Sequence, residues 1–390
     1  MSRRSLSLIF ILIIMVLSFS SASKSVSGSS ISVDNQTLAA QRVDHGPILI
    51  QNNTDFLAQK IVNGWSGDGS GSFPIRIPDY RIEGYQVGIE IANVDLSFLI
   101  SNCETSNYEL TYLDSVGIRI RNCTMGVITH SYAHMKEIGL SIEDSYNITI
   151  AETTTNDCHT GISVSNSTYV FIESNNLGWN DSTGIVLNQT ERCWIYDNSL
   201  IALPDYGILC TRTNFTTIAE NNITSTYLGD DQFSHYGLAS YSSWYLIIES
   251  TEIAFCKVGI DLINNGHSYV AFCNIVGNTE FGIMLHSSSY NITLNSNYLG
   301  FNGINAYDTG SNNYWDSNYW SDYTGQGYYN IPGGQSVDLN PRLFPGETIE
   351  DPPPTTTAQN GDYLRLVLSF GIGFEIIIIL YLVNRRRKNS

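Results

Sequence analysis

Two acidic residues recur at one spacing and are of a type suited to acid–base chemistry. Asp197 and Glu220 each lie thirteen residues after a glycine that begins a short apolar stretch. If these stretches stack as neighbouring strands, the two carboxylates lie about 5 Å apart, close enough for general acid–base work on a glycan or for binding a cation. The chain has 37 Asp and Glu against 19 Lys and Arg. We therefore favour a solvated acidic face and keep both residues only as catalytic candidates.

A second group could bind a soft metal ion. It consists of Met125, His130, His134 and Met135, and Cu(I) prefers sulfur and imidazole ligands. The two histidines would share a face on a helix, but this segment lies between strands, where a spacing of four gives no convergence. We favour surface or turn histidines, assign no metal site, and keep the four residues as candidates.

The cysteines lack the spacing of a metal or redox motif. No Cys-x-x-Cys pair occurs among the seven, Cys193 and Cys210 take apolar strand positions, and Cys158 and Cys256 fall four repeats apart. Four strand spacings are roughly 19 Å, too far for a disulfide. Buried thiols are favoured over a disulfide framework, although an odd number leaves at least one thiol without a partner in the chain.

A repeat of about 22 residues must position these side chains. A glycine followed by alternating apolar residues recurs, a second short strand follows nine to twelve residues later, and no helical half-repeat is present. This pattern predicts an all-β, right-handed parallel β-helix of about ten coils. The repeat glycines are Gly88, Gly117, Gly139, Gly161, Gly184, Gly207, Gly237, Gly259, Gly282 and, less clearly, Gly303.

Asparagines recur about fourteen residues after the repeat glycine. Asn175, Asn198 and Asn221 share this position, and Asn274 and Asn297 lie one place later. Stacked coils would bring them into line, where each amide can bond to the next as an Asn ladder. We predict this ladder as a structural element.

The ends of the chain predict export and anchoring. Arg3 and Arg4 precede an apolar stretch and small residues, as in a signal peptide. The segment 363–383 is long enough to span a membrane, and the basic residues after it place the C-terminus in the cytoplasm. The predicted parts are a signal peptide (1–23), a linker (24–45), an N-terminal cap (46–82), the repeats (83–310), a C-terminal cap (311–346), a Pro/Thr stalk (347–362), the transmembrane helix (363–383) and a basic tail (384–390).

The caps are expected to cover the two ends of the stack. At the N-terminal end, residues 53–62 predict a short helix whose Phe56, Leu57, Ile61 and Val62, with Trp65, cover the first coil. At the C-terminal end, the aromatic segments 313–315 and 318–323 are expected to close the last coil.

Three segments together resemble archaeal NosD-like proteins. They are His45-Gly46-Pro47-Ile48 with Asn63-Gly64-Trp65-Ser66-Gly67-Asp68-Gly69-Ser70, the Gly-led coils, and Asn318-Tyr319-Trp320-Ser321-Asp322-Tyr323-Thr324-Gly325. That family consists of β-helix repeat proteins often described as periplasmic and copper-binding, and the likeness covers about residues 45–345. The resemblance implies the fold and, as its only cofactor, copper.

The composition limits the partners. An acidic chain with few basic residues cannot neutralise nucleic-acid phosphates, and it favours a neutral glycan over an acidic one. Tyr206 and Tyr236, just before repeat glycines, could stack on sugars. Ten Asn-x-Ser/Thr sequons are glycosylation candidates, at Asn35, Asn52, Asn122, Asn147, Asn166, Asn180, Asn188, Asn214, Asn222 and Asn291.

These features together predict a single-pass, membrane-anchored cell-surface scaffold. We expect it to bind extracellular polymers, glycans or other surface proteins without catalysis. A NosD-like copper-handling protein and a carbohydrate-active β-helix enzyme (a lyase, epimerase or hydrolase) are the alternatives.

Overall fold

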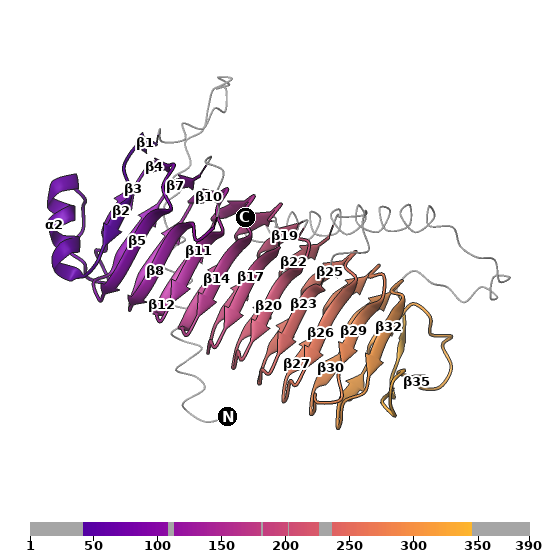
Figure 1. The fold of residues 1–390 in the computed structure, drawn as a ribbon. Helices are drawn as coiled ribbons and strands as arrows, with labels where there is room; N and C mark the ends of the chain where they lie inside the picture. The colour runs from indigo at the N-terminus through magenta and orange to yellow at the C-terminus, as the bar shows by residue number, and fades with distance from the viewer. Residues whose placement is uncertain (1–41, 108–112, 181, 202, 226–235, 345–390) are drawn as a thin grey trace, which may run out of the picture. The chain divides into compact units, whose positions relative to one another are not determined.

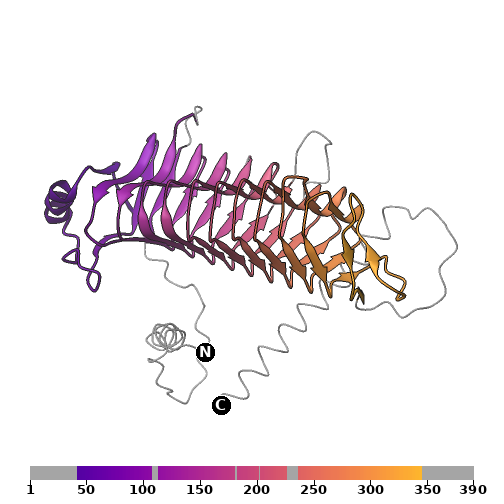
Figure 2. The ribbon, with the colours of Figure 1, turned by 90° about the horizontal axis from the view of Figure 1, so that it is seen from below.

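Short strands stack coil upon coil in the computed structural model, which describes residues 42–107, 113–180, 182–201, 203–225 and 236–344. Each complete coil gives one strand to each of three sheets, and successive coils pair in parallel (Figure 1). Figure 2 shows the same sheets from a perpendicular direction, with the strands of neighbouring coils side by side. The predicted right-handed parallel β-helix is confirmed.

The sheets are named A, B and C. Sheet A consists of β1 (Val43–Asp44), β4 (Tyr80–Glu83), β7 (Glu104–Ser106), β10 (Tyr132–His134), β13 (Thr154–Asn156), β16 (Asn176–Gly178), β19 (Ser199–Ile201), β22 (Asn222–Thr224), β25 (Glu252–Ala254), β28 (Asn274–Val276), β31 (Tyr298–Gly300), β34 (Tyr319–Trp320) and β37 (Arg342–Leu343). Sheet B consists of β2 (Ile48–Ile50), β5 (Val87–Val94), β8 (Val116–Cys123), β11 (Ile138–Glu143), β14 (Thr160–Ser165), β17 (Thr183–Asn188), β20 (Tyr206–Thr211), β23 (Tyr236–Tyr241), β26 (Val258–Ile263), β29 (Phe281–Leu285) and β32 (Ile304–Asp308). Sheet C consists of β3 (Ile75–Pro78), β6 (Phe98–Ser101), β9 (Gly126–Thr129), β12 (Tyr146–Ala151), β15 (Thr168–Glu173), β18 (Trp194–Tyr196), β21 (Thr217–Ala219), β24 (Ile247–Glu249), β27 (Tyr269–Ala271), β30 (Thr293–Asn295), β33 (Tyr314–Asp316), β36 (Val337–Asp338) and the antiparallel β35 (Tyr329–Asn330).

Sheet B has eleven strands, so the described chain makes about eleven turns and not ten. The additional coil begins at β2, where Ile48 pairs with Ile89, so that Pro47 takes the place of a repeat glycine. At the other end Ala306 pairs with Ile283, which puts Asn305, and not Gly303, in register with Gly282.

The repeat glycines are required by space. A Cβ on Gly207 would lie 2.5 Å from the carbonyl oxygen of Gly237 and 2.5 Å from a methyl group of Ile223. Its backbone is not in the left-handed region, so close packing between coils, and not a special φ, excludes a side chain here.

Amide ladders lie along the turn from sheet C to sheet A. Asn175 donates from Nδ2 to Oδ1 of Asn198 at 2.9 Å, and Asn198 donates likewise to Asn221 at 2.9 Å. A second series farther along begins at Asn297. The assignment of Asn274 to the ladder is wrong, because Cys273 holds that position and donates its N–H to Asn297.

The seven cysteines are buried and free, as favoured from the sequence. Several take turn positions that polar residues hold in other coils. Cys103, for example, donates from Sγ to the carbonyl of Ile77 at 3.5 Å, and Cys123 donates to that of Ile91 at 3.4 Å. A cysteine side chain is small and apolar and carries a weak hydrogen-bond donor, so it fits a buried turn position and also bonds to a neighbouring carbonyl oxygen.

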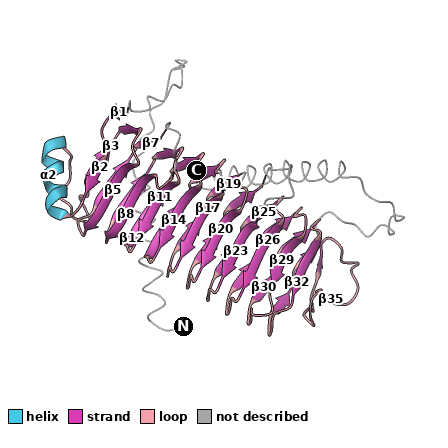
Figure 3. Ribbon diagram, viewed as in Figure 1, coloured by secondary structure: helices cyan, strands magenta, loops and turns pink. Residues whose placement is uncertain are grey.

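Among the described residues one helix is present, α2 (Asn53–Asn63), and it lies at the N-terminal end of the stack (Figure 3). Its N-cap is Asn52, which accepts the N–H of Asp55 at 3.0 Å. Phe56 and Trp65 are buried and meet edge to face at 6.1 Å. The expectation that Leu57, Ile61 and Val62 also cover the coil is wrong, since their exposed fractions are 42%, 79% and 84%.

The C-terminal aromatic motif lies inside the stack. Trp315 and Trp320 are buried, and their indole N–H groups donate to the buried carboxylates of Asp308 at 2.9 Å and Asp338 at 3.2 Å. Asp338 also accepts a hydrogen bond from the side-chain amide of Asn318 at 3.0 Å. The second amide ladder ends here, because a carboxylate accepts hydrogen bonds and does not donate them.

The boundaries of the solenoid differ from those expected. Sheet A already begins at β1, within the segment 24–45 assigned to the linker, and strands of sheets A and C continue through the segment 311–346 assigned to the C-terminal cap. The signal peptide, stalk, transmembrane helix and basic tail lie outside the described residues. Within the described ranges, no helix is long and apolar enough to cross a bilayer.

Candidate functional site

The outer face of sheet B carries two chemically different regions. The charged region comprises Glu90 on β5, Arg119 and Arg121 on β8, and Glu143 on β11. The tyrosine cluster comprises Tyr206 on β20, Tyr236 and Tyr241 on β23, Asp261 on β26, and His286 just after β29.

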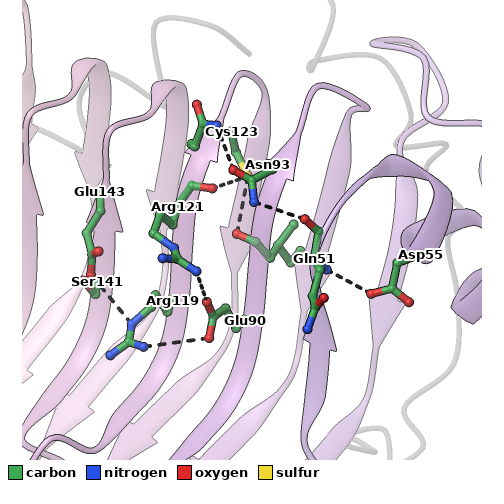
Figure 4. Close-up of polar contacts among 11 residues, drawn as sticks. Gln51, Asp55, Glu90, Asn93, Arg119, Arg121, Cys123, Ser141 and Glu143 are labelled. Atoms are coloured by element: carbon green, nitrogen blue, oxygen red, sulfur yellow. Dashed lines mark hydrogen bonds and ion pairs between the residues drawn. The ribbon is translucent and has the colours of Figure 1, made fainter.

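Opposite charges are paired within the charged region (Figure 4). Nη2 of Arg121 lies 2.9 Å from Oε1 of Glu90, and Arg119 lies 3.8 Å from Glu90 and 3.7 Å from Glu143. Each arginine therefore meets a carboxylate on a neighbouring strand. Pairs of this kind link coils and leave little net charge for a ligand.

In the tyrosine cluster, two aromatic rings stack and a small residue of the same strand is buried. Tyr206 and Tyr236 are paired across neighbouring strands and stack at 5.3 Å with an interplanar angle of 16°. Burial, followed by a hydrogen bond to Tyr206, raises the pKa of Tyr241. Ala239 lies between Tyr236 and Tyr241 along β23 and is 0% exposed.

Asp261 lies beside Ala239 and holds the cluster together. It is 2% exposed, and its Oδ1 lies 2.8 Å from Nε2 of His286, whose side chain is 32% exposed. Burial raises the pKa of Asp261, and the hydrogen bond and charge of His286 partly offset that rise. If Nε2 carries the proton of this bond, Nδ1 of His286 has a free lone pair.

The two tyrosines of β23 are hydrogen-bond donors at neutral pH. Burial, followed by the charge of Asp261, raises the pKa of Tyr236. The charge of Asp261 also contributes to the raised pKa of Tyr241. The cluster thus combines a carboxylate-oriented imidazole, protonated phenols and stacked rings, a set that can bind sugars and transfer protons.

The sequence indicated only two members of this cluster, Tyr206 and Tyr236. Tyr241, Asp261 and His286 were missed because they are scattered over 46 residues of three coils. The signal that could have found them is register: each lies at a fixed distance after its repeat glycine, so aligning the coils places them on adjacent strands.

The predicted carboxylate pair lies elsewhere. Asp197 and Glu220 are left-handed turn residues of successive coils between sheets C and A, and both are exposed. Asp197 accepts a hydrogen bond from Ser174 at 2.9 Å. Glu220 accepts one from Tyr196 at 2.7 Å, which raises the pKa of Tyr196 to about 12. This arrangement has the features of a solvated turn.

The two histidines among the four candidate metal ligands form ion pairs with different coils. His130 pairs with Glu152 of the following coil, whereas Nε2 of His134 lies 3.4 Å from Glu104 of the preceding coil. Met125 is exposed, and Met135 is a left-handed turn residue.

The described residues do not fit the copper that the resemblance implies. They contain no group of three His, Cys, Asp or Glu side chains that could hold a metal ion. Copper binds cysteine as thiolate, but burial raises the pKa of Cys103 and Cys123 to about 11 and that of Cys158, Cys256 and Cys273 to about 12.

The sequons differ in exposure. Asn180 is 1% exposed and accepts the N–H of Cys158, so a glycan cannot be attached there without breaking the coil. Asn52 is exposed but caps α2. Asn35 lies outside the described residues. Exposed or partly exposed side chains remain at Asn122, Asn147, Asn166, Asn188, Asn214, Asn222 and Asn291.

Comparison with known proteins identifies the family. The family model described as "Periplasmic copper-binding protein (NosD)" matches residues 48–232 and 230–325, more than half of the chain. The chain belongs to the NosD family. A search of curated proteins found no match.

Solved structures share the fold of this NosD-family chain. A double mutant of the periplasmic alginate epimerase AlgG has a TM-score of 0.52 and 17% identity, over 75% of this chain and 82% of that one. The A-module of the Azotobacter vinelandii mannuronan C-5 epimerase AlgE6 has a TM-score of 0.48 and 14% identity, over 61% and 72%. At these identities the likeness shows the β-helix alone.

Proposed function

We propose that this NosD-family chain is a cell-surface protein that binds an extracellular polysaccharide along sheet B, over the tyrosine cluster. The observation that carries the proposal is the grouping of Tyr206, Tyr236 and Tyr241 with the Asp261–His286 pair on an ordered face. Sugar sites combine aromatic surfaces with a few fixed polar groups.

The strand spacing suits a polymer. Neighbouring strands lie about 4.8 Å apart, so a linear glycan that crosses the strands meets a new set of side chains at each coil. Tyr236 and Tyr206 would contact one side of such a chain and His286 the other. In the charged region the positions equivalent to Asp261 and His286 hold paired Arg and Glu side chains, which would have to separate before they bound a sugar.

The ends of the sequence suggest where binding occurs. The basic and apolar N-terminal segment favours export, and the apolar segment 363–383 followed by basic residues favours a single C-terminal membrane anchor. We propose that the solenoid is presented outside the cell in this way. Protease treatment of intact cells would digest the solenoid and spare the basic tail if this topology is right.

Binding to immobilised and soluble polysaccharides tests the proposal. We expect the full-length protein to bind at least one polysaccharide of a panel that includes both neutral and uronate polymers. Tyr236→Ala should weaken that binding about tenfold or more, equivalent to about 1.4 kcal/mol. Tyr314→Ala is the matched control, because Tyr314 is 54% exposed on sheet C.

Two results would count against polysaccharide binding. One is the absence of binding to every polymer of the panel by folded protein. The other is stoichiometric binding of Cu(I) that His286→Gln abolishes, which would favour metal handling. Equal losses for Tyr236→Ala and Tyr314→Ala would move the binding site away from sheet B.

A further inference from the structure

Tyr241 and His286, whose side chains can donate and accept protons, lie on one line across sheet B. Thr211 pairs with Tyr241, Tyr241 pairs with Ile263, and the N–H of His286 bonds to the carbonyl of Leu262, so His286 continues the line. Two strand spacings of about 4.8 Å therefore separate the backbones of Tyr241 and His286, about 10 Å in all. Ile263 lies between them, so a sugar ring that contacts both groups would lie over its partly buried side chain.

Arg212 adds a cation at the end of this line. It follows Thr211, is exposed, and its N–H bonds to the carbonyl of Tyr241 at 2.9 Å. Its guanidinium can bind a carboxylate with two parallel hydrogen bonds.

The charges that face this line differ from those of the whole chain. Asp261 is buried and bonded to His286. Glu280, just before β29, lies 3.4 Å from Nζ of Lys257 and is thereby paired. The net charge of −18 favours a neutral glycan over an acidic one. Near this line, however, the carboxylates of Asp261 and Glu280 already have partners, so Arg212 can attract an anionic glycan.

We propose that the tyrosine cluster is a proton-transfer site for a uronate residue of the bound polysaccharide, with His286 as the base, Tyr241 as the acid and Arg212 as the carboxylate-binding residue. The inference rests on the proposed polysaccharide binding. Asp261 is a positioning residue, because it is buried and acts by fixing the tautomer and direction of His286.

The step balances without a further reactant. Nδ1 of His286 takes the proton from the sugar carbon next to the carboxylate, and the C–H electron pair moves into the carboxylate to give an enediolate, whose charge Arg212 stabilises. The hydroxyl of Tyr241 then returns a proton to that carbon from the opposite side, which inverts it. Tyr241 regains a proton from water, and His286 releases one to water.

Solvent exchange tests this step independently of the final product. Full-length protein is incubated in deuterated buffer with oligomers of mannuronate, guluronate or galacturonate, and deuterium on the sugar carbons is measured by NMR. We expect incorporation next to the carboxylate in at least one of the three. His286→Gln and Tyr241→Phe should reduce it about 100-fold or more, in the range of a lost general acid or base.

Matched variants distinguish chemistry from damage to the fold. His267→Gln, on an exposed histidine of the turn before β27, and Tyr314→Phe should leave exchange unchanged. Asp261→Asn should lower the rate of exchange without weakening the binding of the oligomers, since His286 loses the group that fixes its tautomer and direction. A purely structural role for Asp261 would weaken binding and exchange together.

Each other outcome overturns the inference. Binding without deuterium incorporation into any of the three oligomers would leave the proposed function standing and remove the proton-transfer site. Incorporation that persists in folded His286→Gln protein would assign the base elsewhere. Failure of all binding would remove both proposals.

Discussion

Glu90, Arg119 and Arg121 of the charged region occupy the same positions of sheet B as Asp261 and Tyr241 of the tyrosine cluster. The two regions differ in how their charged groups are paired and buried. The side chain of Glu90 is 19% exposed and meets two arginines, whereas that of Asp261 is 3% exposed and meets one imidazole. In the charged region, attraction between strands satisfies each charge. In the tyrosine cluster, a buried carboxylate is kept although its burial is unfavourable.

This difference teaches where to look for function on a repetitive scaffold. Every coil of a solenoid must satisfy its neighbours, and most outer positions do so with exposed polar residues or paired charges. A buried carboxylate that orients an exposed imidazole is not needed for stacking, because other coils hold Ser163 or Val186 at the position of Asp261. Such groups are candidates for function.

The largest expected effect comes from enlarging Ala239, a buried residue of the tyrosine-bearing strand β23. Ala239→Leu should lower the free energy of unfolding by about 1–3 kcal/mol, because Ala239 is 0% exposed and a larger side chain must displace the groups that bury it. Ser163→Leu at the partly exposed equivalent position should change it by less than about 0.5 kcal/mol. Chemical denaturation measures both. Equal effects would mean that the burial of Ala239 does not limit the size of its side chain.

Substitution of the carboxylates should have opposite effects in the two regions. Burial raises the pKa of Asp261, so ionisation of Asp261 destabilises the folded state as the pH rises through that raised value. Asp261→Asn should therefore stabilise the protein at pH 7, on the order of 1 kcal/mol, and the gain should vanish below the pKa of the unfolded chain. Glu90→Gln should destabilise it by up to about 1 kcal/mol. Urea denaturation between pH 3 and 8 compares them, and a loss of stability in Asp261→Asn would refute the account given for burial.

The fold could be predicted from the sequence because it is specified many times over. Each coil repeats the glycine, the apolar alternation and the polar turn, so an error at one coil, such as Gly303 or Asn274, leaves the architecture intact. The first coil was missed because Pro47 replaces the glycine. The exposure of Ile61 and Val62 was missed because an apolar helix face shows no sign of which residues meet a partner.

The candidate site could not be predicted in the same way. Asp261 and His286 are 25 residues apart, and nothing in their local sequence shows that one is buried on an outer face. Their contact depends on the number of residues in each coil, which sets the register. Asp197 and Glu220 satisfied a simple spacing rule, yet they lie on solvated turns because the left-handed residue of each turn points outward.

Alkaline titration should separate the tyrosines of the cluster from exposed ones. Because the folded pKa of Tyr236 and of Tyr241 is raised, their stabilising contribution is complete below pH 10, the usual pKa, and is lost as the pH rises through the folded values. The buried thiols lose their contribution in an overlapping range above pH 9. Ultraviolet difference spectra should show a late-titrating fraction that Tyr241→Phe reduces and Tyr314→Phe does not. Simultaneous titration of all tyrosines in folded protein would contradict the raised values.

Salt should weaken the exposed ion pairs of the charged region, and this is the smallest expected effect. The pair of Arg121 and Glu90 is partly exposed, so its contribution is a few tenths of a kcal/mol and is screened at 1 M salt. The destabilisation by Arg121→Ala should therefore shrink between about 0.05 M and 1 M sodium chloride, as measured by urea denaturation. The effect of Ala239→Leu should persist at both concentrations, because packing and not charge causes it. If salt removed both effects equally, the distinction between an electrostatic and a packed region of sheet B would fail.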